Sequence, residues 1–224
     1  MGVQIKICGL TSAEAVRAAA TAEFAGFVFF PRSPRHLAPG EASRLASLLP
    51  GAVKRVAVMV DPDDSMLRET LAAFRPDFLQ LHGRETPARV AAIKRSFGLA
   101  VIKAIPVAEA ADLDAARAFE DVADWLLFDA KPRPGALLPG GNAMAFDWDL
   151  LANRRWARPW LLSGGLNPGN VRDAIARTGA AAVDVSSGVE NRPGDKNPAL
   201  VTDFIAAVRG ASTAFSGTTD RATR

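Results

Sequence analysis

The regular alternation of short apolar segments with helical ones is the feature that most constrains the fold of this chain. Runs rich in Val, Ile, Leu and Phe recur at 4–8, 24–30, 53–60, 78–82, 100–106, 125–129, 160–164 and 182–187. Segments with helical periodicity follow them at 12–22, 40–49, 63–74, 86–97, 108–121, 147–152, 168–178 and 198–209. Nearly continuous apolar strands are typical of parallel sheets covered by helices. The pattern therefore predicts a closed (β/α)8 TIM barrel, with an open doubly wound sheet as the alternative.

Length and composition favour a single domain. The chain has 224 residues, of which 49% are hydrophobic and 23% charged, as in ordinary globular proteins. We expect the barrel to span residues 1–210. The segment 211–224 is small, polar and aperiodic, so we expect a flexible tail there.

Charge, cysteine content and hydropathy exclude several classes of protein. The net charge of +3 is too small to indicate nucleic-acid binding, but it suits a small anionic substrate. A single cysteine excludes an intrachain disulfide framework. No apolar run approaches the roughly 20 residues that span a bilayer, and the start does not resemble a secretion signal. We therefore expect a cytoplasmic protein without a membrane partner.

Four helix starts carry a capping residue followed by proline, the residue favoured at the first helical position. They are Asp61-Pro62, Thr86-Pro87, Asn167-Pro168 and Asn197-Pro198. In particular, this pattern predicts that Asp61 is an N-cap.

Strand alternation sorts the polar side chains, because every second residue of a barrel strand points towards the barrel axis. The inward-facing polar residues are then Lys6 and Cys8 on the first strand, Gln80 and His82 on the fourth, Asp129 on the sixth, and Asp184 and Ser186 on the eighth. Several of them stand at the carboxyl ends of their strands, the rim where barrels of this class place catalytic groups.

Two glycine-containing turns at the same rim predict a phosphate site. Barrels frequently bind phosphate with backbone N–H groups after the seventh and eighth strands. The candidate residues are Ser163, Gly164 and Gly165 after the seventh strand, and Ser186, Ser187 and Gly188 after the eighth.

The position of Cys8 favours a chemical role over simple burial. It is the last residue before a glycine turn and lies beside Lys6, so it could be held as a thiolate, the form that accepts a proton. Asp129 ends a strand and is followed by a Gly- and Pro-rich loop over 130–145, with no helix for it to cap. Connections of this length usually form binding segments, and we expect this one to lie over the active site.

Two further residues are candidates for binding substrate. His82 faces the rim, but no second cluster of ligands accompanies it, so we expect no metal site. Arg35 lies in the loop after the second strand, where its guanidinium could clamp a carboxylate. Arg32, in the same loop, is the weaker candidate.

Six segments together resemble phosphoribosylanthranilate isomerase, an enzyme of tryptophan biosynthesis. They are KICGLT at 6–11, GFVFFPRSPRHL at 26–37, LQLHG at 79–83, LLFDAKPRPG at 126–135, LLSGGLNPGNV at 161–171 and DVSSGVENRPGDKNP at 184–198. The segments follow one another in order and are spread along almost the whole chain. The cysteine after KI and the DVSSGVE segment are the most specific, and no matching position departs from the family pattern.

The resemblance implies an Amadori rearrangement of N-(5-phosphoribosyl)anthranilate by general acid and base catalysis, without a cofactor. It implies that Asp129, as a protonated acid, opens the ribose ring and that Cys8 then removes the proton from C2. Arg35 would hold the anthranilate carboxylate. Asp184 would contact the sugar, and we expect His82, Lys6 and Gln80 also to serve substrate binding.

Two alternatives remain. The related isomerase of histidine biosynthesis performs the same rearrangement on a phosphoribosyl-aminoimidazole substrate, but it has aspartate where Cys8 stands here. A non-catalytic phosphate-binding barrel is the second. For oligomeric state we expect a monomer or a weak homodimer.

Overall fold

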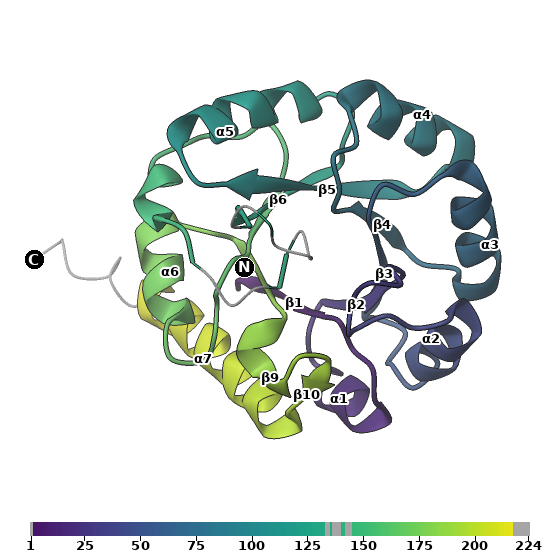
Figure 1. Ribbon diagram of the computed structural model, residues 1–224. Helices are drawn as coiled ribbons and strands as arrows, with labels where there is room; N and C mark the ends of the chain where they lie inside the picture. The colour runs from purple at the N-terminus through teal and green to yellow at the C-terminus, as the bar shows by residue number, and fades with distance from the viewer. Residues whose placement is uncertain (1, 133–134, 136–139, 142–144, 217–224) are drawn as a thin grey trace, which may run out of the picture.

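A computed structural model describes residues 2–132, 135, 140–141 and 145–216 of the chain. Its strands form one closed parallel barrel in which each strand pairs with the next and β8 pairs with β1, as Figure 1 shows. The strands are β1 (Gln4–Cys8), β2 (Phe24–Val28), β3 (Lys54–Met59), β4 (Phe78–Leu81), β5 (Ala100–Val107), β6 (Trp125–Ala130), β7 (Trp160–Leu162) and β8 (Ala182–Val185). This confirms the predicted barrel and excludes the open sheet.

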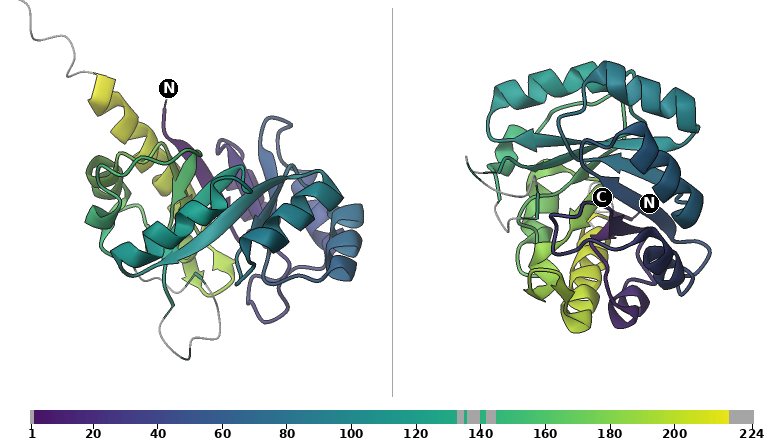
Figure 2. Two further views of the ribbon diagram at one scale, coloured as in Figure 1. Left: turned by 90° about the horizontal axis from the view of Figure 1, so that it is seen from above. Right: turned by 45° about the vertical axis from the view of Figure 1, so that its right-hand side comes forward.

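Helices surround the barrel on the outside (Figures 1 and 2). The α-helices are α1 (Ala13–Ala18), α2 (Pro39–Ala46), α3 (Asp64–Phe74), α4 (Pro87–Phe97), α5 (Ala110–Ala116), α6 (Val171–Thr178) and α7 (Pro198–Ser216). Short 3-10 helices are η1 (Arg117–Phe119), η2 (Trp148–Leu150) and η3 (Ser187–Val189). Helix α7 lies between α6 and α1 and so completes the ring. In the described part of the chain, no helix is long and apolar enough to cross a membrane.

The strands bury two different faces, as their alternation predicts. Outward residues such as Ile5, Ile7 and Leu79 pack with the helices in the larger hydrophobic cluster. Inward residues such as Cys8 and Leu127 belong to a second cluster inside the barrel. Because both faces are buried, a shift of one residue in any strand would exchange the two sets. The register therefore fixes which polar side chains reach the barrel interior.

Two of the four predicted helix starts are confirmed. Thr86 accepts a hydrogen bond from the Arg89 N–H at 3.2 Å, and Pro87 is the first residue of α4. Asn197 accepts one from the Ala199 N–H at 2.9 Å, directly before α7.

The other two starts are wrong. Asp61 is not an N-cap: its φ is +45°, and its carboxylate accepts from the Arg84 N–H at 2.7 Å. The cap of α3 is Asp63, which accepts from the Met66 N–H at 2.8 Å. Asn167-Pro168 forms a turn, and α6 begins only at Val171.

Three further differences concern the second half of the barrel. The helix expected over 147–152 is reduced to η2 and is followed by Asn153 with a φ of +61°. After β8 an unpredicted hairpin forms between β9 (Glu190–Arg192) and β10 (Asp195–Lys196). Helix α7 continues to Ser216, six residues past the expected end of the barrel, and the rest of the expected tail lies outside the described residues.

Candidate active site

A pocket of about 820 Å³, partly open to solvent, lies at the carboxyl ends of the strands. Cys8 ends β1, His82 directly follows β4, Asp129 lies at the end of β6, and Ser186 directly follows β8; all four line this pocket. Residues far apart in the chain thus meet at one rim, as the strand alternation predicts.

Some predicted site residues lie beside this pocket and do not line it. Lys6 and Gln80 have no exposed surface and lie deeper in the barrel. Gly188 does not line it either, and a Cβ at that position would lie 1.8 Å from the Leu166 carbonyl oxygen. Gly188 therefore allows the β8 turn to pack against the β7 turn.

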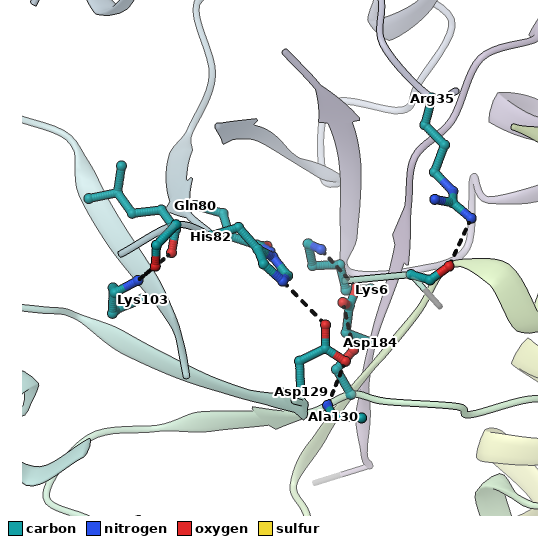
Figure 3. A network of polar contacts seen from close by, with 12 residues as sticks. Lys6, Arg35, Gln80, His82, Lys103, Asp129, Ala130 and Asp184 are labelled. Carbon is teal, nitrogen blue, oxygen red and sulfur yellow. Dashed lines mark hydrogen bonds and ion pairs between the residues drawn. The ribbon is translucent and has the colours of Figure 1, made fainter. Parts of the chain in front are cut away.

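Below Cys8, a buried ion pair joins β1 to β8 (Figure 3). Lys6 Nζ lies 2.8 Å from Asp184 Oδ1, and Ser163 Oγ lies 3.2 Å from Asp184 Oδ2. Burial, the largest single influence, would lower the pKa of Lys6, but the neighbouring Asp184 and Cys8 together outweigh it and raise the pKa. Lys6 therefore stays charged beneath the thiol.

Burial also governs the thiol of Cys8. It raises the pKa of Cys8 above its ordinary value, and the positive charge of Lys6 offsets this only in part. The sequence left open whether a thiolate exists before substrate binds. The structure favours a neutral thiol in the free protein, because a raised pKa reduces the thiolate fraction at neutral pH.

Alkylation of Cys8 by iodoacetamide should therefore be slow at pH 7 and should speed up with rising pH, with a midpoint above about 8.5, the ordinary pKa of cysteine. Because Cys8 is the only cysteine, mass spectrometry of the intact protein reports on this thiol alone. An alkylation rate that has already reached its plateau at pH 7 would show a preformed thiolate and contradict this expectation.

Asp129 has a partner on each carboxylate oxygen. Oδ1 accepts the Ala130 N–H at 2.9 Å, and Oδ2 lies 3.2 Å from His82 Nε2, as Figure 3 shows. On its other side, His82 Nδ1 lies 2.8 Å from Gln80 Nε2. A polar chain therefore runs from the barrel interior to the acid at the rim.

Arg35 is buried and lines the pocket, but a protein carboxylate already occupies part of its donor fork. Its Nε and Nη2 donate to the two oxygens of Glu190 at 2.7 and 2.8 Å. Lys196 Nζ also binds Glu190. Burial would raise the pKa of Glu190, but these two cations outweigh it and lower the pKa below its usual range. Of the three guanidinium nitrogens, Nη1 is thus the one that does not donate to Glu190.

Four charged residues have contacts at or near the pocket that no sequence pattern had predicted. Glu190 and Lys196 stand in the DVSSGVENRPGDKNP segment, and proximity to that rim motif was the available signal. Glu85 and Lys103 form a buried pair at 2.7 Å behind β4 and β5. No local pattern indicated this second pair, because its partners meet only through the packing of neighbouring strands.

The turn after β7 has a backbone conformation that favours glycine. Gly164 and Gly165 have φ values of +86° and +66°, which favour glycine. A Cβ on Gly164 would also lie 2.7 Å from the Ala130 nitrogen. These two glycines line the pocket together with Ser163, Ser186 and Ser187.

The long connection after β6 is described only in part. Lys131, Pro132, Gly140 and Gly141 line the pocket, in agreement with its expected position over the site. Residues 133–134, 136–139 and 142–144 lie outside the described part of the chain. Among the residues that the structure describes, no three His, Cys, Asp or Glu side chains are grouped to hold a metal ion.

Comparison with known proteins agrees with this geometry. A family described as N-(5'phosphoribosyl)anthranilate (PRA) isomerase matches residues 5–207. The N-(5'-phosphoribosyl)anthranilate isomerase of Rhodospirillum centenum is 56% identical over 92% of this chain and 98% of its own length. That of Paramagnetospirillum magneticum is 53% identical over 94% of this chain and 99% of its own.

Solved structures give the same result. The phosphoribosyl anthranilate isomerase of Thermotoga maritima superposes with a TM-score of 0.82 at 36% identity, covering 93% of this chain and 99% of that one. A second isomerase structure, solved with reduced 1-(o-carboxyphenylamino)-1-deoxyribulose 5-phosphate, has a TM-score of 0.80 at 34% identity, with coverage of 93% and 99%.

Proposed function

The chain belongs to the N-(5'-phosphoribosyl)anthranilate isomerase family, and we propose that Cys8 and Asp129 carry out the family's reaction in the pocket at the strand ends. That reaction isomerises N-(5-phosphoribosyl)anthranilate to 1-(2-carboxyphenylamino)-1-deoxyribulose 5-phosphate in tryptophan biosynthesis. The observation that supports the assignment most is that a thiol and a carboxyl from two distant strands line one pocket together with the glycine turns.

The chemistry requires an acid and a base acting in turn. Asp129 donates a proton to the ribose ring oxygen, the bond from C1 to that oxygen breaks, and a protonated Schiff base forms between C1 and the anthranilate nitrogen. Cys8, whose thiol has by then lost its proton to the solvent in the open pocket, removes the proton from C2 as a thiolate. The electron pair left at C2 neutralises the iminium and gives an enolamine, which tautomerises to the ketone as C1 takes up a proton and the C2 hydroxyl loses one. The cationic Schiff base favours the thiolate, since an opposite charge nearby stabilises the charged form of the base.

The other pocket residues bind the two ends of the substrate. Arg35, held by Glu190, binds the anthranilate carboxylate through Nη1. The backbone N–H groups at Gly164, Gly165 and Ser187 bind the phosphate, with Ser163 and Ser186 beside them. Asp184 lines the pocket and contacts the sugar hydroxyls, while Lys6 supports Asp184 from below.

The organisation of the protein completes the proposal. Residues 1–210 form the catalytic barrel, and the enzyme acts in the cytoplasm as a monomer or a weak homodimer. The exposed apolar surface supports this oligomeric state. Within the described part of the chain, Leu48 is the large hydrophobic residue that is exposed, with 40% of its surface accessible. An extensive obligate interface would require a larger apolar patch.

Turnover of both candidate substrates by the purified protein tests this function. We expect conversion of N-(5-phosphoribosyl)anthranilate to its ketose, with kcat/KM in the ordinary enzymatic range of about 10⁴–10⁸ M⁻¹s⁻¹. Chromatography of the reaction mixture measures this conversion. The phosphoribosyl-aminoimidazole substrate of the histidine pathway should be converted at least about 100-fold less efficiently, since Arg35 is placed for a carboxylate. Turnover of the imidazole substrate alone would overturn the proposal, as would binding of phosphate esters without any turnover.

A further inference from the structure

We propose that His82 is the positioning residue of Asp129, with Gln80 fixing its ring and Lys103 fixing its backbone. The inference rests on the proposed role of Asp129 as the acid and adds residues that act through it. An acid can protonate the ring oxygen only if its carboxyl is held at hydrogen-bonding distance and in the correct orientation.

The contact between His82 and Asp129 restrains the carboxyl from the pocket side. The Asp129 side chain is 9% exposed and that of His82 is 14% exposed, so solvent competes little for this hydrogen bond. The backbone N–H of Ala130 holds the other oxygen, Oδ1. One lone pair of each oxygen is then engaged, which restricts rotation of the carboxyl about its own axis and leaves a second lone pair for the acidic proton.

Gln80 determines which nitrogen of His82 faces the acid with a proton. Its amide nitrogen lies 2.8 Å from His82 Nδ1 and can only donate, so Nδ1 accepts and the neutral ring carries its hydrogen on Nε2. That hydrogen points at Asp129 Oδ2. Within the described residues the Gln80 amide oxygen is buried without a hydrogen-bond partner. An unpaired buried oxygen costs about 1–3 kcal/mol, which argues that the amide is retained for its contact with His82.

The backbone of His82 is held by a separate buried pair on the outer face of the barrel. Lys103 Nζ donates to the carbonyls on either side of His82, those of Leu81 at 3.2 Å and Gly83 at 2.9 Å. Glu85 neutralises the lysine at 2.7 Å and accepts the Gly83 N–H at 3.0 Å. Apolar residues of similar volume often replace a buried ion pair without loss of stability. Its hydrogen bonds to the residues flanking His82 indicate a role in positioning.

Two substitutions at His82 separate its N–H from its bulk. His82→Leu removes the donor at similar size, and we expect kcat to fall about 100-fold with KM changed less than threefold. His82→Gln places an amide N–H near the position of Nε2 and should retain at least about a third of wild-type kcat. Urea unfolding of each variant verifies that the barrel remains folded.

A double-mutant cycle tests the link from Gln80. Gln80→Leu should lower kcat about tenfold in the wild type but less than twofold in the His82→Gln background, because that background has no ring nitrogen for Gln80 to bind. A purely structural role of Gln80 would give equal losses in both backgrounds and would overturn the proposal.

Three other results would overturn it as well: a kcat of His82→Leu within threefold of wild type, a change confined to KM, or equal losses for His82→Leu and His82→Gln. Asp129→Asn measured in parallel distinguishes a failure of His82 as the positioning residue from a failure of Asp129 as the acid. If Asp129→Asn is inactive while His82→Leu is normal, only this inference fails; if Asp129→Asn turns over normally, the proposed acid fails first.

Discussion

Replacing Asp129 by asparagine is expected to lower kcat about 10²- to 10⁴-fold, the usual contribution of a general acid. Asparagine preserves the shape of the side chain but cannot supply an acidic proton to the ring oxygen. KM should change little, because the substrate is held mainly at its phosphate and carboxylate ends. Steady-state kinetics on N-(5-phosphoribosyl)anthranilate give both constants.

Asp114→Asn is a suitable control for this substitution. The Asp114 side chain is 68% exposed and pairs with Arg154 at the surface, outside the pocket. The same chemical change there should leave kcat within twofold of wild type. If Asp129→Asn also stays within about tenfold, another group must open the ribose ring, and the assignment of Asp129 is wrong.

Replacing Cys8 by alanine should lower kcat about 10³-fold, because no base then removes the C2 proton. The loss should be clear because this is the only cysteine in the chain and no other thiol can substitute. Cys8→Ser is the matched variant. It keeps a polar atom of similar reach, but a serine hydroxyl does not ionise near neutral pH and is a far poorer proton acceptor than a thiolate. We expect it to be nearly as slow as Cys8→Ala.

Substrate deuterated at C2 identifies the step that is lost. In the wild type we expect a primary isotope effect on kcat if proton removal limits turnover. If another step limits turnover, the isotope effect should appear in single-turnover kinetics. In Cys8→Ala the ring should still open, since Asp129 is intact, while proton loss from C2 becomes negligible. Rapid loss of deuterium from C2 in this variant would assign the base to another residue.

Sequence periodicity was sufficient to predict the barrel and the facing of its strands. Alternation of buried apolar residues predicted that Cys8 and Asp129 both face the barrel interior. This needs no knowledge of tertiary contacts, since strand parity is a local property. The same argument placed Lys6 and Gln80 on the inside. It could not show that they lie deeper than the pocket, because depth along the axis depends on how neighbouring strands are staggered.

What could not be predicted depends on partners distant in sequence. Asp61 precedes a proline and resembles an N-cap, yet its N–H donates to Glu85, 24 residues away, and this contact keeps it out of the helix. The guanidinium of Arg35 was predicted to clamp a substrate carboxylate, but the carboxylate of Glu190, 155 residues away, occupies two of its nitrogens. The raised pKa of the Cys8 thiol likewise follows from its burial in the assembled barrel, which the local sequence does not show.

We propose that Cys8 and Asp129 act from opposite sides of a sugar whose phosphate is held by the β7 and β8 turns. A crystal structure of this protein with a reduced analogue of the product tests it most directly. We expect the phosphate at the backbone N–H groups of Gly165 and Ser187, the thiol beside C2, and the Asp129 carboxyl within hydrogen-bonding distance of the oxygen that was in the ring. A phosphate bound away from these turns, or both groups on one side of the sugar, would contradict the account.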